Sequence, residues 1–255
     1  MAGKFMIMAG WDDVPHLSEE QKAEELKNIP PYQRDARAKG IPQLGAGAIY
    51  PVNESEIIVE PFRIPDHFRQ AYGMDVGWNR TAVVWGALDG DSDVLYLYSE
   101  HYRGQADPPV HAAAVRARGT WIPGVIDPAA RGRGQRDGER LLKDFVDLGL
   151  ETLTTAFNGV EAGIYEVWMR IATGRLKVFK TLLNWREEYR FYQRDEKGRI
   201  KEGLADHLMD GTRYLVVSGL DRAIVRPAEM WGIANRGGSI QSDYNPFAGE
   251  WDAKK

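Results

Sequence analysis

Cysteine is absent from this 255-residue sequence. Its absence excludes disulfides, zinc sites built on thiolates and a cysteine nucleophile, and it suits a reducing cytoplasm. No apolar run approaches the roughly 20 residues that span a bilayer, so we expect no membrane-spanning helix. The stretch from Met1 to Trp11 lacks the long hydrophobic region and the cleavage site of a secretory signal.

A large excess of positive charge is also absent. The net charge of −4 at pH 7 counts mildly against nucleic-acid binding, because proteins of that class are often strongly basic. It does not exclude this class, since charge can be segregated along a chain. Residues 131–143 and residues 186–201 are locally basic in a chain that is acidic as a whole.

The sequence does have enough apolar material for a core, with 43% hydrophobic residues. We divide it into a connector over 1–65, a main domain over 66–219 and a loosely ordered tail over 220–255 that is rich in Gly, Asn, Ser and Pro. In the connector, Ser18 and Gln21 form a capping box that predicts the start of a helix, and Pro30-Pro31 predicts its end.

Hydrophobic patterning in the main domain predicts strands that alternate with helices. Three short strands come first and indicate an antiparallel meander, and the later strands are separated by helices. This order predicts an α/β fold with a mixed sheet covered by helices on both faces, as in the RNase H-like fold. The predicted strands are 71–76, 81–88, 94–102, 124–127, 153–157 and 176–179. The predicted helices are 108–118, 139–148, 160–172 and 204–217, and 189–193 with a turn at 196–198 is predicted as a strand and hairpin.

Three aspartates occupy special places in this pattern. Asp75 lies in the first strand, Asp127 ends the fourth, and Asp210 lies on the last helix. Any one of them alone is more often a cap or an ion-pair partner than a metal ligand. Together they would repel one another unless a cation lay between them, and a hard divalent ion with oxygen ligands answers that need. Phosphodiester hydrolysis by two Mg²⁺ or Mn²⁺ ions uses such a site.

These aspartates also lie in recognisable motifs. GMDVGWNRTAVVWGA, PGVIDPAARGR and DHLMDGTRY resemble the nuclease motifs of the large terminase subunits of tailed bacteriophages, and the connector resembles the segment that joins their ATPase motor to the nuclease. The resemblance covers about residues 10 to 219. It implies an RNase H-like endonuclease that cuts concatemeric double-stranded viral DNA during genome packaging in the host cytoplasm. It also implies the small terminase subunit and the portal or procapsid as partners.

Carried over residue by residue, the resemblance implies that Asp75 bridges both metal ions, that Asp127 binds one and that Asp210 completes the site. One departure concerns the motor. No GxxxxGK[ST] phosphate loop is present, so we expect no ATP hydrolysis by this chain and interpret it as the C-terminal part of a larger protein.

Several neighbouring residues have two interpretations each. Asp206 is either a supporting acid that holds a metal-bound water or the N-cap of the last helix. His207 is either a proton shuttle or a partly buried helix histidine. The basic residues in 131–143 and in the hairpin of 186–201 also have two interpretations. They either contact the DNA backbone or are solvated charges, and on an edge hairpin such charges also oppose aggregation. The candidate DNA contacts are Arg131, Arg133, Arg136 and Lys201.

Two other functions compete with the packaging nuclease. A junction resolvase or transposase-type nuclease would use the same fold and would prefer branched DNA. A portal-docking module with a vestigial acidic site would bind no divalent metal and would bind its partner through the tail.

Overall fold

The computed structural model describes residues 10–11, 18–28, 38, 47–128, 135–195 and 197–230, and at 135–140 and 230 it describes the backbone only. The predictions for Pro30-Pro31, for Arg131 and Arg133 and for the tail beyond residue 230 lie outside the described residues. The predicted capping box is confirmed: the Ser18 backbone N–H donates to Gln21 Oε1 over 3.0 Å, and the Gln21 N–H donates to Ser18 Oγ over 3.3 Å.

A mixed sheet of seven strands forms the centre of the fold, in the order β1-β7-β4-β3-β2-β5-β6. The pairs β2–β3 and β3–β4 are antiparallel, which confirms the predicted meander. The pairs β2–β5, β5–β6, β4–β7 and β1–β7 are parallel. The strands are β1 (Ile58–Val59), β2 (Arg69–Val76), β3 (Thr81–Leu88), β4 (Leu95–Arg103), β5 (Gly124–Ile126), β6 (Leu153–Thr155) and β7 (Leu176–Phe179).

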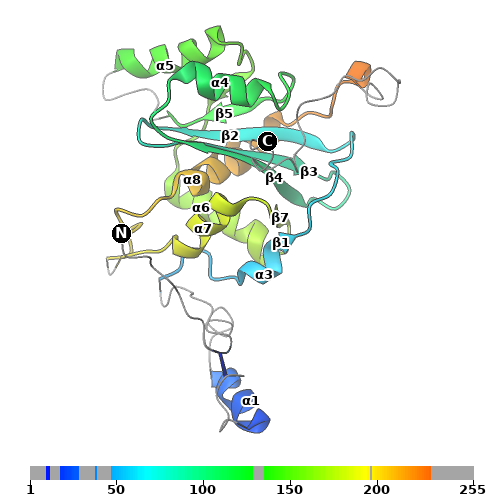
Figure 1. The fold of residues 1–255 in the computed structure, drawn as a ribbon, viewed down its shortest axis with the longest axis vertical. Coiled ribbons are helices and arrows are strands. Elements are labelled where there is room, and N and C mark those ends of the chain that lie inside the picture. Colours follow the sequence, from blue (N-terminus) through cyan, green and yellow to red (C-terminus); the bar gives the residue numbers. More distant parts are fainter. Residues whose placement is uncertain are drawn as a thin grey trace, which may run out of the picture.

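Helices cover both faces of this sheet, as the sequence predicts. In Figure 1, α4 and α5 lie above the sheet and α6, α7 and α8 lie below it. None of the helices in the described ranges combines the length and the apolar stretch needed to cross a bilayer. The helices are α1 (Glu19–Asn28), α3 (Glu54–Ile57), α4 (Pro108–Arg116), α5 (Gln135–Asp147), α6 (Val160–Ala172), α7 (Leu183–Phe191) and α8 (His207–Tyr214), followed by a π-helical turn (Leu215–Gly219) and the 3-10 turns Leu220–Arg222 and Ala228–Met230.

Strand β2 separates two hydrophobic cores. Because side chains alternate across a strand, Tyr72 and Met74 pack on the α4 and α5 side, whereas Ala71 packs on the α8 side. Asp75 has the same parity as Ala71 and Gly73. The carboxylate therefore belongs to the face that α8 covers, and the apolar neighbours Met74 and Val76 belong to the other face, as the strand period predicts.

Helix α8 lies unusually close to β2. A Cβ atom added at Gly73 would lie 2.0 Å from the Gly211 carbonyl oxygen and 2.9 Å from the Leu215 nitrogen. No side chain fits there, so the glycine allows the helix backbone to approach the strand backbone directly. This contact brings the first turns of α8 to the end of β2 where Asp75 lies.

The structure corrects three of the predicted elements. The segment predicted as a strand at 189–193 mostly belongs to α7, which ends at Phe191, because Trp185 and Tyr189 are buried at helical spacing. In the described residues of 193–201, the predicted hairpin is reduced to an isolated antiparallel bridge between Arg194 and Ile200. The last helix begins at His207 rather than at residue 204, since residues 202–204 form turns and bends.

Two pairings with the sheet were not predicted. The short strand β1, which lies in the segment interpreted as a connector, pairs with β7. Ile224, which lies in the segment interpreted as a tail, forms an antiparallel bridge with Gln70.

Candidate functional site

Asp75 and Asp127 lie at the ends of neighbouring parallel strands. The register of β2 and β5 pairs Met74 with Ile126, so the next residue on each strand is an aspartate. The Asp127 N–H donates to the Met74 carbonyl over 2.9 Å, which extends the pairing by one residue. Two carboxylates from distant parts of the sequence therefore meet at one edge of the sheet, as their strand positions predict.

Helix α8 adds further polar groups to the same edge. His207 begins the helix, Asp210 lies one turn later, and Arg213 and Tyr214 follow at helical spacing. The close contact at Gly73 brings this polar face of the helix to the strand ends. The three aspartates predicted as a group come from β2, from the end of β5 and from α8, and they lie on the same side of the sheet.

Each of the three aspartates accepts a hydrogen bond or an ion pair from a residue of α8. His207 Nδ1 lies 2.8 Å from Asp75 Oδ2. The Tyr214 hydroxyl donates to Asp127 Oδ1 over 3.0 Å. Arg213 Nη2 lies 2.9 Å from Asp210 Oδ1.

Arg213 and Tyr214 connect two of these contacts. Arg213 Nη2 also donates to the Tyr214 hydroxyl over 3.3 Å, and its guanidinium carbon lies 4.6 Å from the centre of the Tyr214 ring. Both side chains are 2% exposed. A continuous chain of hydrogen bonds therefore runs from Asp210 through Arg213 and Tyr214 to Asp127.

Burial and neighbouring negative charges shift the titration of Asp210 and of Tyr214. Burial raises the pKa of Asp210 to about 6; Arg213 opposes this shift, and the charges of Asp206 and Asp75 add to it. Burial likewise raises the pKa of the Tyr214 hydroxyl, and the negative charges of Asp210, Asp127 and Asp75 raise it further. All three predicted acids thus act electrostatically on one hydroxyl group.

His207 has the opposite environment. Its hydrogen bond to Asp75 raises the pKa of the imidazole, although burial opposes this. The structure therefore favours a charged imidazole beside the carboxylate. Both interpretations of this residue remain open, because its ring is partly buried and also contacts a candidate metal ligand.

Asp206 occupies the N-cap position of α8, but within the described ranges its side chain forms no capping hydrogen bond. Burial raises the pKa of its carboxyl, as does the charge of Asp75, while His207 opposes the shift. Asp206 is thus the N-cap residue of α8 by position, without a capping bond from its side chain, and the interpretation as a supporting acid stays a prediction.

The donor set at this edge fits a hard divalent cation, because carboxylate oxygens are the ligands that Mg²⁺ and Mn²⁺ prefer. Burial raises the pKa of Asp210, and the charges of Asp206 and Asp75 add to this; a bound cation would offset the cost of keeping this carboxylate ionised. Within the part of the chain that the structure describes, no three His, Asp or Glu side chains are already grouped closely enough to hold a metal ion. Ion binding would therefore require the carboxylates to move closer together.

Of the four candidate DNA contacts, the structure describes the side chain of Lys201. Lys201 is exposed at the base of the bridged hairpin, where its N–H donates to the Gln193 carbonyl over 2.9 Å. Arg136 lies on α5, but its side chain is outside the described residues, as are Arg131 and Arg133. Four arginines of the 186–201 segment form ion pairs within the chain: Arg186 and Arg190 with Glu54, Arg194 with Glu161, and Arg199 with Asp195.

Sequence reasoning did not identify Arg213, Tyr214 or Glu188 as part of the site. Arg213 follows Asp210 by three residues and Tyr214 by four, so helical spacing would have placed both near that acid. Glu188 contacts the start of α8 from α7, which was predicted as a strand over its last turn.

Comparison with known proteins identifies the family. Residues 72–218 match the family described as the terminase RNaseH-like domain. The chain is 34% identical over 212 residues to the large terminase subunits of Salmonella phage P22 and Enterobacteria phage LP7, a match that covers 79% of this chain. It covers 42% of the P22 protein and 44% of the LP7 protein, so the chain spans less than half the length of these curated relatives.

Solved structures agree with this assignment. The nuclease domain of the P22 large terminase is similar with a TM-score of 0.65 and 31% identity, over 71% of this chain and 96% of that domain. The large terminase of a thermophilic bacteriophage shares the fold, with a TM-score of 0.57 and 21% identity over 83% of this chain and 55% of that protein. The fold, the matched residues and the identity to the P22 and LP7 proteins together show that this chain belongs to the RNase H-like domain family of phage large terminase subunits.

Proposed function

We propose that this chain is a metal-dependent endonuclease that cuts concatemeric double-stranded DNA during packaging of a phage genome. The observation that carries the proposal is the meeting of Asp75, Asp127 and Asp210 at one edge of the sheet. Membership of the terminase family supports the substrate class, since one relative of this fold is a P22 nuclease domain. The ATPase motor lies outside the proposal.

In this proposal Asp75, Asp127 and Asp210 would hold two divalent ions, Mg²⁺ or Mn²⁺. Bound ions of this kind lower the pKa of water and neutralise charge on a phosphate. The chain's own part is to keep the carboxylates ionised and oriented. Tyr214 orients Asp127, Arg213 offsets the charge of Asp210, and His207 holds one oxygen of Asp75. Asp206 supports the site through a water molecule.

The proposal extends to domains and partners. Residues 1–65 serve as the connector to a motor domain, 66–219 as the nuclease, and 220–255 as a tail. Arg131, Arg133, Arg136 and Lys201 contact the DNA backbone without reading sequence, which would give low sequence specificity. The small terminase subunit and the portal or procapsid are the expected partners in the host cytoplasm.

A plasmid cleavage assay tests the proposal. We expect the wild-type chain to convert supercoiled plasmid to nicked and linear forms with Mg²⁺ or Mn²⁺, and to lose this activity with EDTA. Asp75→Asn, Asp127→Asn and Asp210→Asn should each abolish cleavage while the circular dichroism spectrum stays unchanged. Asp91→Asn, in an exposed turn, serves as the matched control. Cleavage by all three variants at the wild-type rate would refute the proposed site.

A further inference from the structure

The first turn of α8 takes its cap from another helix. Asp206 stands at the N-cap position without a capping hydrogen bond from its side chain, within the described residues. Instead, Glu188 Oε2 on α7 accepts the Leu208 N–H over 2.6 Å and the Met209 N–H over 3.3 Å. Helix N-termini leave such N–H groups without partners, and a carboxylate there also interacts favourably with the helix dipole.

Helix α7 is itself fixed to the sheet and to α8. Glu100 on β4 accepts the Asn184 N–H over 3.0 Å and the Trp185 N–H over 2.9 Å, so a carboxylate of the sheet caps α7 in turn. A second contact joins the two helices one turn later along α8, where Trp185 Nε1 of α7 donates to Thr212 Oγ1 over 2.8 Å. These contacts define the position of α8 along its axis and about it.

The position of α8 decides the geometry of the acid site. Residues of this helix make the contacts to Asp75 and Asp127, and the helix carries Asp210 itself. We infer that Glu188 is a positioning residue, which sets the place of His207 and Asp210 relative to the strand acids by capping α8 from α7. The inference rests on the proposed function for its link to metal binding, but the capping itself does not.

Glu188 lies beside open space. It is 3% exposed and lines a pocket of about 630 Å³ together with Arg80, Tyr102, Asn184, Glu187, Phe191 and the 203–205 loop. Water in this pocket can reach the N–H groups of α8 if the side chain is shortened. Substitutions at Glu188 are therefore expected to leave the domain folded, so that their effect on the site can be measured.

Two variants separate the effect of side-chain length at position 188 from the effect of its charge. Glu188→Gln keeps an oxygen at the length needed to accept the two N–H groups but loses the charge. Glu188→Asp keeps the charge but is shorter by one methylene. Burial raises the pKa of Glu188 to about 7, so the measurements are made at roughly pH 8, where the carboxylate is ionised.

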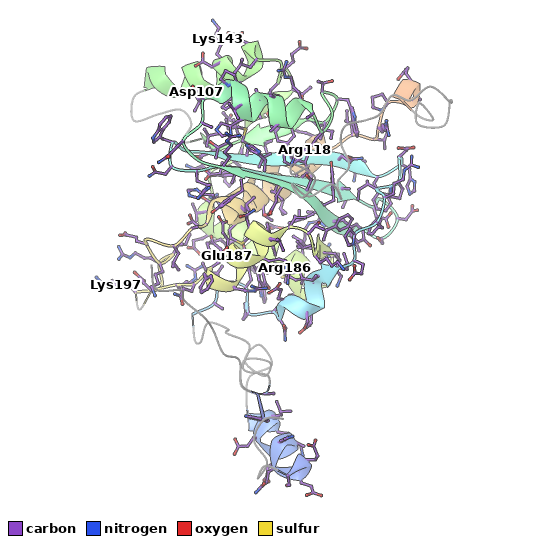
Figure 2. The ribbon with its side chains drawn as sticks, in the orientation of Figure 1. Asp107, Arg118, Lys143, Arg186, Glu187 and Lys197 are labelled. Carbon is purple, nitrogen blue, oxygen red and sulfur yellow. The ribbon has the colours of Figure 1, made fainter. Side chains whose placement is uncertain are left out.

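The first measurement is Mn²⁺ affinity by calorimetry on the full chain. We expect Glu188→Asp to weaken Kd by about tenfold, which is typical of lost support behind metal ligands, and Glu188→Gln to stay close to wild type. Glu187→Asp and Glu187→Gln are the matched controls, since Glu187 is the exposed neighbour on α7, on the same side of the sheet as α8 (Figure 2). A Glu188→Asp variant with wild-type affinity, or a Glu188→Gln variant as weak as Glu188→Asp, would overturn the inference.

The second measurement needs no metal. Hydrogen exchange at the Leu208 and Met209 amides reports the cap directly. We expect both amides to lose protection in Glu188→Asp and to keep it in Glu188→Gln; unchanged protection in Glu188→Asp would contradict the cap. If the wild-type chain bound no Mn²⁺, the proposed function would fall, and the exchange data would still decide whether Glu188 holds α8.

Discussion

His207 Nδ1 lies 2.8 Å from Asp75 Oδ2 and so joins the first residue of α8 to the end of β2. The contact raises the pKa of His207 above its ordinary value near 6.5. A group whose pKa is raised by folding stabilises the native state fully below its unfolded pKa, and this stabilisation disappears as pH rises through the folded pKa.

His207→Gln should therefore lower the free energy of unfolding more in acid than in base when EDTA keeps divalent ions away. Urea denaturation at several pH values measures this. The difference between variant and wild type should be largest below about pH 6 and should shrink toward alkaline pH. A difference that grew with pH would show that the imidazole is not charged beside Asp75.

The Tyr214 hydroxyl is expected to orient Asp127. Tyr214→Phe removes the 3.0 Å hydrogen bond and leaves the buried ring in place. We expect a loss of about 1 to 2 kcal/mol in unfolding free energy, because a charged acceptor is left without this donor. Tyr165→Phe, at a ring that is 55% exposed, is the control for loss of a hydroxyl. Equal effects of both variants would show that the bond to Asp127 contributes nothing.

Metal binding should depend on pH through Asp210, whose pKa burial raises to about 6. A carboxylate must lose its proton to ligate a cation, so affinity should rise with pH up to this value and level off above it. Below pH 6 we expect Mn²⁺ affinity to change by about tenfold per pH unit for one linked proton. Calorimetry in buffers of different ionisation enthalpy counts the proton released. A flat affinity between pH 5 and pH 7 would exclude Asp210 as a ligand.

The contact between β2 and α8 permits a paired test at two glycines. A methyl group at Gly73 would meet the Gly211 carbonyl oxygen at 2.0 Å, whereas one at Gly211 would lie 3.3 Å from the Gly73 oxygen. Gly73→Ala should destabilise the fold by about 3 kcal/mol or more, since backbone must move. Gly211→Ala should change stability by about 1 kcal/mol at most, because alanine favours the helix. Thermal denaturation compares the two, and equal tolerance would mean that the helix can shift freely.

Much of this site follows from the sequence, because strands have a simple period. The meeting of Asp75 with the end of β5 depends on strand order and register. Hydrophobic alternation predicts the strands, and their order in the sheet follows from the predicted RNase H-like fold. The contacts of Arg213 and Tyr214 depend on side-chain rotamers and on how closely α8 approaches β2. That approach depends on Gly73, whose role becomes visible only once the helix is known to lie over it.

The missed role of Glu188 has a different cause. The last turn of α7 was predicted as a strand, because Tyr189 and Tyr192 are typical of strands as well as of helices. Burial of Trp185 and Tyr189 at a spacing of four residues decides for the helix. A strand at this place does not predict that Glu188 lies against α8. The sequence therefore did not predict that Glu188 caps this helix.

The histidine pair formed by His101 and His111 should respond to pH in the direction opposite to His207. His101 Nε2 lies 2.9 Å from His111 Nδ1 between β4 and α4. Burial lowers the pKa of His101 to about 4, and the charge of His111 adds to this. The unfolded chain therefore binds a proton before the folded chain does, and stability is lost as pH falls from about 6.5 toward 4.

His101→Gln cannot take up this proton, although its amide can still form a hydrogen bond with His111. Relative to wild type, its unfolding free energy should fall less steeply in acid, by up to about 1.4 kcal/mol per pH unit within that window. Urea denaturation between pH 7 and pH 4.5 measures the two slopes, and His67→Gln at an exposed position controls for the substitution. Because raised acids such as Asp210 titrate alike in both proteins, the difference between the slopes reports the His101–His111 pair. Parallel curves for wild type and His101→Gln would mean that this imidazole already carries its proton in the folded chain.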